Sequence, residues 1–161
     1  WVDIVRGVLY ILLPMAFILA LVLASQGVIQ NMNEYTEYLP LEHSHAAKPL
    51  IAQGPAASQV AIKMLGSNGG GFFNANSAHP FENPNPFTNL INILAILMIP
   101  VSYVYCFGVM VGDRRQGWVL LAAMTMIFVP LAMVSAWGET HGNPLFDDAA
   151  IEQSAGNMEG K

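Results

Sequence analysis

Residues 55–76 read PAASQVAIKMLGSNGGGFFNAN, a short helix-forming run followed at once by three consecutive glycines. Proline suits the first turn of a helix and glycine its end, so the pattern predicts a helix over residues 55–66. At 1.5 Å per residue, its roughly ten central residues extend about 15 Å. That is half of the roughly 30 Å of hydrocarbon in a bilayer, so we expect a half-helix that enters a membrane without crossing it.

The glycine-rich turn at residues 67–72 would then lie at membrane depth. Irregular backbone is tolerated there only where it is buried in protein or lines a water-filled cavity. Consecutive glycines can adopt positive φ angles without strain, which lets successive carbonyl oxygens face the same side. Such a row of oxygens can replace the water shell of a potassium ion, and the carboxyl end of the half-helix adds a favourable field. The candidate ligands are Ser67, Asn68, Gly69, Gly70 and Gly71.

Known nucleotide-binding motifs fit the glycine run less well. A phosphate-binding loop needs Gly-Lys-Ser/Thr after its glycines, but Phe72 and Phe73 stand there. A dinucleotide-binding turn needs a preceding strand and the spacing G-x-G-x-x-G, and the sequence has neither. A flexible linker remains the main alternative, although linkers rarely carry two phenylalanines at their flank.

Three long apolar runs surround this segment. The chain is 54% hydrophobic and only 11% charged, whereas about 25% of residues are charged in a typical soluble domain. Each run is close to the roughly 20 residues that cross a bilayer as a helix. We therefore predict an all-α membrane protein: a transmembrane helix, a re-entrant pore half-helix with its filter loop, a second transmembrane helix, and a further transmembrane helix. The predicted spans are residues 4–24, 90–111 and 117–137.

The positive charges predict which side each loop faces. The loop at residues 112–116 carries Arg114 and Arg115, so it should be cytoplasmic, and Arg6 agrees if the start of the first span lies on the same side. The half-helix and filter loop would then enter from the extracytoplasmic side. Residues 138–161 should face that side too.

Composition excludes some functions, and a few polar residues remain open. The net charge of −5 argues against a nucleic-acid partner, and the single cysteine excludes an internal disulfide. Since the chain begins at Trp1 without a methionine, we take it as an excerpt of a longer protein. Lys63 could snorkel or pair with a carboxylate. His43 and His45 form a weak metal-binding pattern that fits a surface loop better. His79 could sense pH at the mouth but fits better as a brace for the turn before Pro80, and Asn92 should form a hydrogen bond to a neighbouring helix.

Residues 66–84, GSNGGGFFNANSAHPFENP, closely resemble the potassium-importing subunit (KdpA) of the bacterial Kdp P-type ATPase. That family belongs to a superfamily built from four covalently linked helix–pore loop–helix repeats. The resemblance covers the whole chain and implies that residues 1–111 form the second repeat. Residues 117–137 would then be the first span of the third.

The resemblance implies potassium uptake across the bacterial cytoplasmic (inner) membrane, with K⁺ as the transported ion. ATP would be hydrolysed by another subunit of the Kdp complex, so this chain should bind no ATP; it contains no Asp-Lys-Thr-Gly phosphorylation motif. The filter positions carry over to residues 67–71, and Asn76 becomes a pore-facing candidate. A passive potassium channel, a secondary transporter of the same superfamily and a non-conducting membrane scaffold remain alternatives.

Overall fold

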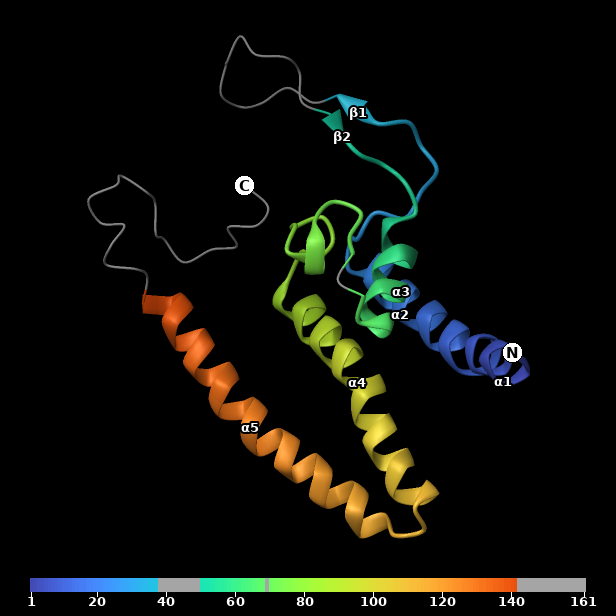
Figure 1. The fold of residues 1–161 in the computed structure, drawn as a ribbon. Helices are drawn as coiled ribbons and strands as arrows, with labels where there is room; N and C mark the ends of the chain where they lie inside the picture. Colours follow the sequence, from blue (N-terminus) through green and yellow to red (C-terminus); the bar gives the residue numbers. More distant parts are fainter. Residues whose placement is uncertain (38–49, 69, 142–161) are drawn as a thin grey trace. The chain divides into compact units, whose positions relative to one another are not determined.

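A computed structural model describes residues 1–37, 50–68 and 70–141 of the chain (Figure 1). Most of the described residues are helical, as the sequence predicts. The helices are α1 (Val2–Gly7), η1 (Val8–Leu12), α2 (Leu13–Ser25), α3 (Ala56–Gly66), η2 (Ala75–Ser77), α4 (Pro86–Met110) and α5 (Arg114–His141). Two-residue strands, β1 (Thr36–Glu37) and β2 (Leu50–Ile51), pair antiparallel between α2 and α3.

Three helical segments of the described chain are long and apolar enough to cross a membrane. They are Val2–Ser25, Pro86–Met110 and Arg114–Gly138. The prediction of three helices able to cross a membrane is therefore confirmed. The second helix begins four residues earlier than the apolar run predicts, at Pro86, because Asn85 caps it there through a hydrogen bond from Thr88 N–H (2.9 Å).

The first segment is continuous but changes its helical geometry beside a proline. Val8–Leu12 form the π-helix η1, and Pro14 follows at the start of α2. Proline has no N–H to donate to the carbonyl four residues earlier, here that of Tyr10. A widened π-helical turn is one way in which a helix accommodates such a local mismatch. The proline marks an irregular turn in a segment that otherwise stays helical.

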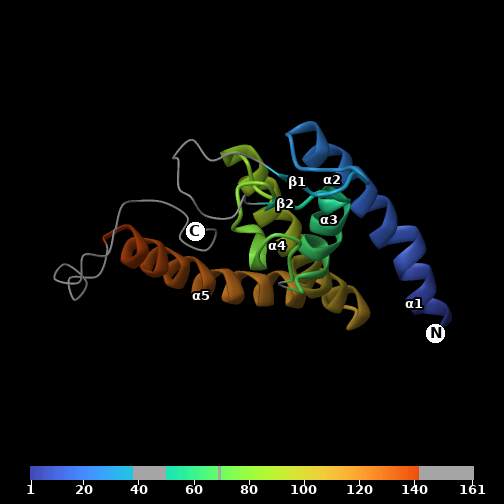
Figure 2. The same cartoon turned by 90° about the horizontal axis from the view of Figure 1, so that it is seen from above.

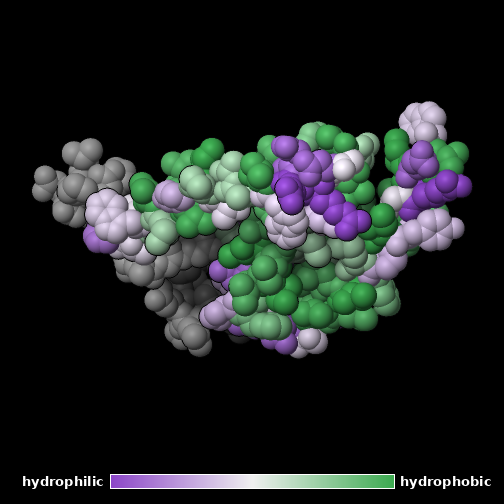
Figure 3. Space-filling model, turned by 90° about the horizontal axis from the view of Figure 1, so that it is seen from below, coloured by the Kyte–Doolittle hydropathy of each residue, from purple (hydrophilic) through white to green (hydrophobic). Residues whose placement is uncertain are grey.

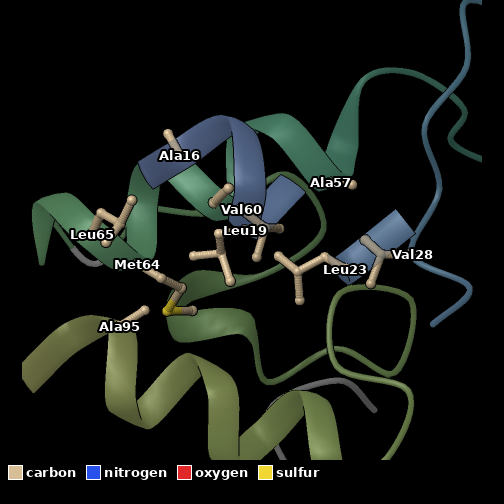
Figure 4. Close-up of a cluster of buried hydrophobic side chains, with 10 residues drawn as sticks. Ala16, Leu19, Leu23, Val28, Ala57, Val60, Met64, Leu65 and Ala95 are labelled. Atoms are coloured by element: carbon tan, nitrogen blue, oxygen red, sulfur yellow. The ribbon is translucent and has the colours of Figure 1, made fainter. Parts of the chain in front are cut away.

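Trp1–Met98 belong to one compact unit, in which α3 lies beside α2 (Figures 1 and 2). The close-up in Figure 4 shows Leu19 and Leu23 of α2 reaching toward Val60 of α3, while Met64 extends toward Ala95 of α4. Leu23 and Val60 are completely buried. Small residues let the two helices approach closely, as in other helix pairs of membrane proteins: Ala16 on α2 and Ala57 and Ala61 on α3.

The described residues from Ile99 to His141 belong to a second compact unit. Its described part contains the end of α4, the turn at Gly112 (φ 81°) and α5. The two helices nearly touch at two glycines: a Cβ atom on Gly108 would lie 2.8 Å from the backbone nitrogen of Gly117. A Cβ atom on Gly117 would lie 3.1 Å from the carbonyl oxygen of Val104. Only glycine fits this approach without moving the backbone.

Large apolar side chains remain exposed on all three long helices. Figure 3 shows one face of the molecule, where apolar residues cover most of the described surface. Soluble proteins rarely expose apolar patches of this extent, whereas helices that contact lipid or other membrane helices must do so. Examples are Phe17, Ile18, Leu94, Met126, Leu131 and Val134.

Candidate functional site

The amino end of α3 is held by the segment that follows α2. The first N–H groups of a helix have no partner inside it. Here Ala57 N–H donates to the carbonyl oxygen of Ile29 (2.9 Å), and Ser58 N–H donates to Oε1 of Gln30 (2.9 Å). These bonds fix where the short helix begins, and its packing against α2 fixes its direction.

The carboxyl end of α3 opens into the glycine-rich turn. Gly66 is the last helical residue, as predicted, but the left-handed capping position falls one residue later, on Ser67 (φ 51°, ψ 31°). This position usually holds glycine. Ser67 N–H donates to the carbonyl oxygen of Met64 (3.3 Å), and Ser67 Oγ donates to that of Ile96 on α4 (3.3 Å). Serine thus ties the start of the turn to a second helix.

Four of the five predicted filter residues are described, and Gly69 lies outside the described residues. Ser67, Asn68, Gly70 and Gly71 are all exposed in this chain. Asn68 Oδ1 accepts a hydrogen bond from Gly70 N–H (3.1 Å), which closes the turn with a side chain. In the described part of the chain, the carbonyl oxygens of these four residues accept no hydrogen bond. Their lone pairs therefore remain open to a ligand on the exposed side.

A buried ion pair contacts the backbone that directly follows the glycines. Lys63 Nζ on α3 donates to Oε2 of Glu82 (2.7 Å), and the two side chains are only 3% and 0% exposed. Oε1 of the same carboxylate accepts hydrogen bonds from the N–H groups of Phe72 (2.7 Å) and Phe73 (2.9 Å). Lys63 therefore pairs with a carboxylate, one of the two arrangements that the sequence left open.

The environment of Glu82 favours its charged form. Burial alone would raise the pKa of this carboxyl group, but the Lys63 ammonium and the two backbone N–H groups outweigh it. The net result is a pKa below the ordinary value for glutamate. Between Lys48 and Asp113, Lys63 and Glu82 are the only charged residues in the sequence, and this isolation is the signal that could have predicted their pairing.

Aromatic rings stiffen the chain as it leaves the turn. The ring of Phe73 stacks on that of His79 (centroids 5.1 Å apart) and meets Phe81 edge-on (5.4 Å). His79 Nδ1 accepts a hydrogen bond from Phe81 N–H (3.1 Å). The prediction that His79 braces the turn before Pro80 is confirmed.

The structure does not join Asn76 to the glycine-rich turn. Asn76 is exposed and left-handed (φ 55°), and no hydrogen bond links it to the described residues of the turn. The next residue, Ser77, is also left-handed (φ 54°), and its buried Oγ has no hydrogen-bond partner among the described residues. A pore-facing role for Asn76 stays a prediction.

The structure bears differently on the predictions for Asn92 and for the pair His43 and His45. Asn92 on α4 is 4% exposed, and neither atom of its amide has a hydrogen-bond partner among the described residues, so the predicted helix–helix bond is not made within them. His43 and His45 lie outside the described residues. Within the described ranges, no group of three or more His, Cys, Asp or Glu side chains could hold a metal ion.

Comparison with known proteins identifies the family. The family model described as "Potassium-transporting ATPase A subunit" (KdpA) matches residues 1–161, which is the whole chain. The chain belongs to the potassium-transporting ATPase A subunit family. The resemblance found in the glycine-rich segment is thereby confirmed over its full extent.

Curated relatives agree with this family. The potassium-transporting ATPase potassium-binding subunit of Methylococcus capsulatus is 50% identical over 187 residues, which cover 100% of this chain and 31% of that protein. The proteins of the same name from Solibacter usitatus and Rhodospirillum centenum are 54% and 53% identical over 161 residues, covering 100% of this chain and 28% of each. The chain therefore spans about three tenths of the length of these relatives.

Proposed function

We propose that this chain carries one potassium-binding filter segment of an ATP-driven potassium uptake pump. The observation that carries the proposal is that Ser67, Asn68, Gly70 and Gly71 are exposed and that their carbonyl oxygens accept no hydrogen bond from the described residues. The name that the relatives share, potassium-binding subunit of a potassium-transporting ATPase, supports the same ion and the same energy source.

The geometry of α3 supports a filter at half the depth of a membrane. Its 11 residues extend about 16 Å at 1.5 Å per residue, roughly half the hydrocarbon thickness. The carboxyl end of a helix carries partial negative charge, which favours a cation at the turn that follows. Carbonyl oxygens there would replace the water molecules that a potassium ion sheds. No carboxylate lies within residues 67–72, so an ion could also leave.

The chain alone supplies one side of such a filter. We propose that residues 1–111 form one helix–pore loop–helix repeat, that α5 begins the next, and that the remaining filter segments come from other parts of the full-length subunit. The turn would open to the extracytoplasmic side of the bacterial inner membrane, since Arg114 and Arg115 favour a cytoplasmic loop after α4. An ATP-hydrolysing subunit would be the essential partner.

A substitution in the turn of the full-length subunit tests this function. Gly70→Asp places a carboxylate beside Oδ1 of Asn68, which lies 3.5 Å from the position of a Cβ atom. In the assembled ATPase we expect the potassium concentration for half-maximal ATPase activity to rise by about tenfold or more, and discrimination against sodium to fall. Gly7→Ala is the matched control, because a Cβ atom there meets nothing within 4 Å.

Two outcomes would contradict the proposal. If Gly70→Asp keeps the potassium dependence and sodium discrimination of the unmodified complex, the turn does not bind the ion. If purified protein in liposomes passes potassium down its gradient without ATP or a partner subunit, a passive channel replaces the pump.

A further inference from the structure

The contacts of Glu82 reach the filter turn through its backbone. Its Oε1 atom accepts from the N–H groups of Phe72 and Phe73, which leave the glycine-rich turn directly after Gly71. A carboxylate that accepts two backbone N–H groups forms stronger bonds than a neutral acceptor does. The Glu82 side chain has no exposed area and both bonds are partly buried, so water competes poorly for the carboxylate.

Because of peptide geometry, these two hydrogen bonds also fix the direction of two carbonyl groups. A trans peptide unit is planar, so its N–H and C=O groups point in opposite directions. The Phe72 N–H shares its peptide unit with the Gly71 carbonyl, and the Phe73 N–H shares its unit with the Phe72 carbonyl. Because Glu82 holds both N–H groups, the oxygens of Gly71 and Phe72 must point away from the Lys63–Glu82 pair.

Pairing with Lys63 allows the Glu82 carboxylate to stay charged while it is buried beside the turn. An unpaired carboxylate buried next to a cation site would hold the cation too tightly and would itself be costly to bury. Lys63 Nζ lies 2.7 Å from Oε2 and neutralises the pair, while Oε1 stays free for the backbone. Lys63 sits in the last turn of α3, where a positive charge is also favoured by the helix dipole.

The packing of the Phe72 ring also restricts the position of this residue. A Cβ atom on Gly54 would lie 3.0 Å from the ring of Phe72, so glycine leaves just enough room for that ring beside the start of α3. The ring of Phe72 thus lies close to Gly54, and its N–H is bonded to Glu82. The residue after Gly71 has little freedom to rotate its peptide units.

We infer that Glu82, held by Lys63, is a positioning residue that aims the carbonyl oxygens of Gly71 and Phe72 toward the ion. This inference rests on the proposed function of the turn and adds Phe72 to its oxygen ligands. It predicts that ion affinity and selectivity depend on an acceptor at position 82, and that the charges of the pair matter much less.

Two double variants of the full-length subunit, assembled with its ATPase partner, separate the acceptor from the charge. Lys63→Met with Glu82→Gln removes both charges but keeps an amide oxygen that can accept from Phe72 and Phe73. Lys63→Met with Glu82→Leu removes both charges and the acceptor. Asp3→Asn is the control for loss of a carboxylate, because the Asp3 side chain is 97% exposed and its pairing with Arg6 is loose (3.6 Å).

We expect the glutamine variant to keep a half-maximal potassium concentration within about threefold of the unmodified complex. The leucine variant should raise this concentration by about tenfold or more and lose discrimination against sodium. Its maximal ATPase rate at saturating potassium should stay within about twofold, a split that general damage to the fold would not produce. Equal potassium dependence and sodium discrimination in the two double variants, whether normal or impaired, would overturn the inference.

A second variant covers the case in which the leucine variant does not assemble. Glu82→Asp keeps the charge but retracts the carboxylate by about 1.5 Å, the length of one carbon–carbon bond, so it cannot hold Lys63 and both N–H groups together. We expect a shift of the same sign but smaller, about threefold. Unchanged potassium dependence and sodium discrimination in assembled Glu82→Asp would overturn the inference.

The results also separate failure of this inference from failure of the proposed function. If Gly70→Asp changes potassium dependence but the Glu82 variants do not, the turn is a filter and Glu82 does not position it. If neither changes it, the filter itself is wrong.

Discussion

The segment around the glycine-rich turn and the hairpin of α4 and α5 are held together by opposite means. Near the turn, charged and polar side chains are buried and paired: Lys63 with Glu82, and Glu82 with two backbone N–H groups. In the hairpin, Gly108 and Gly117 bring two helices into backbone contact, and large apolar side chains stay exposed on α5.

The difference reflects what each region must do. Helices satisfy their own backbone groups, so a helical hairpin in a membrane needs only close packing between its members. An irregular turn leaves N–H and carbonyl groups without helical partners, and each must be bonded or directed. In this chain a buried ion pair therefore supports the irregular turn, whereas a close approach of two glycines joins the helices of the hairpin.

The largest loss of stability is expected from removing one member of the buried Lys63–Glu82 pair. Glu82→Leu leaves the Lys63 ammonium buried without a partner and two N–H groups without an acceptor. Loss of one partner from a buried ion pair costs about 3–5 kcal/mol. We expect a large fall in the melting temperature or yield of the assembled complex, measured in detergent, and partial recovery when Lys63→Met is added. If the single variant is as stable as the double variant, the pair is not buried as described.

A smaller loss of stability is expected from a substitution in the hairpin of α4 and α5. Gly108→Ala places a methyl group 2.8 Å from the nitrogen of Gly117, so the two helices must separate near their turn. Overpacking of this kind typically costs about 1–3 kcal/mol. We expect a lower melting temperature with an unchanged half-maximal potassium concentration. Gly138→Ala, where a Cβ atom meets nothing within 4 Å, is the control. A shift in potassium dependence with normal stability would show that the two regions are not separate in function.

The smallest loss of stability is expected from removing the amino-terminal cap of α4. Asn85 Oδ1 accepts from Thr88 N–H (2.9 Å), and Asn85 N–H donates back to Oγ1 of Thr88 (3.2 Å). Asn85→Ala removes the first bond, and loss of such a cap costs about 1 kcal/mol. Asn85→Asp should retain most of the stability, because aspartate caps helices equally well. Equal loss in both variants would mean that the bond from the Asn85 amide to Gln26 (3.3 Å) matters more than the cap.

Sequence reasoning predicted the regular parts of this chain well, for a physical reason. Uncharged runs of about 20 residues have few alternatives to a membrane-crossing helix, and Pro55 and Gly66 marked the ends of α3 closely. The brace at His79 was also predicted, from its place in the turn before Pro80.

The irregular parts could be predicted only in outline. Lys63 and Glu82 are 19 residues apart, and their contact depends on how the turn folds back, which no local pattern specifies. The left-handed positions fall on Ser67, Asn76 and Ser77; serine rarely adopts this geometry and asparagine does so more often, so glycine alone was a poor guide to them. Of the predicted ligands, Gly69 lies outside the described residues, and Asn76 makes no hydrogen bond to the described residues of the turn.

The most direct test is to locate the ion in the complete subunit. Thallium can stand in for potassium, and its anomalous scattering would mark the site in crystals of the assembled complex. The account predicts thallium on the exposed side of residues 67–72, in contact with backbone carbonyl oxygens that include those of Gly71 and Phe72, and opposite the Lys63–Glu82 pair. Thallium bound elsewhere in the membrane, with this turn facing bulk water, would contradict it.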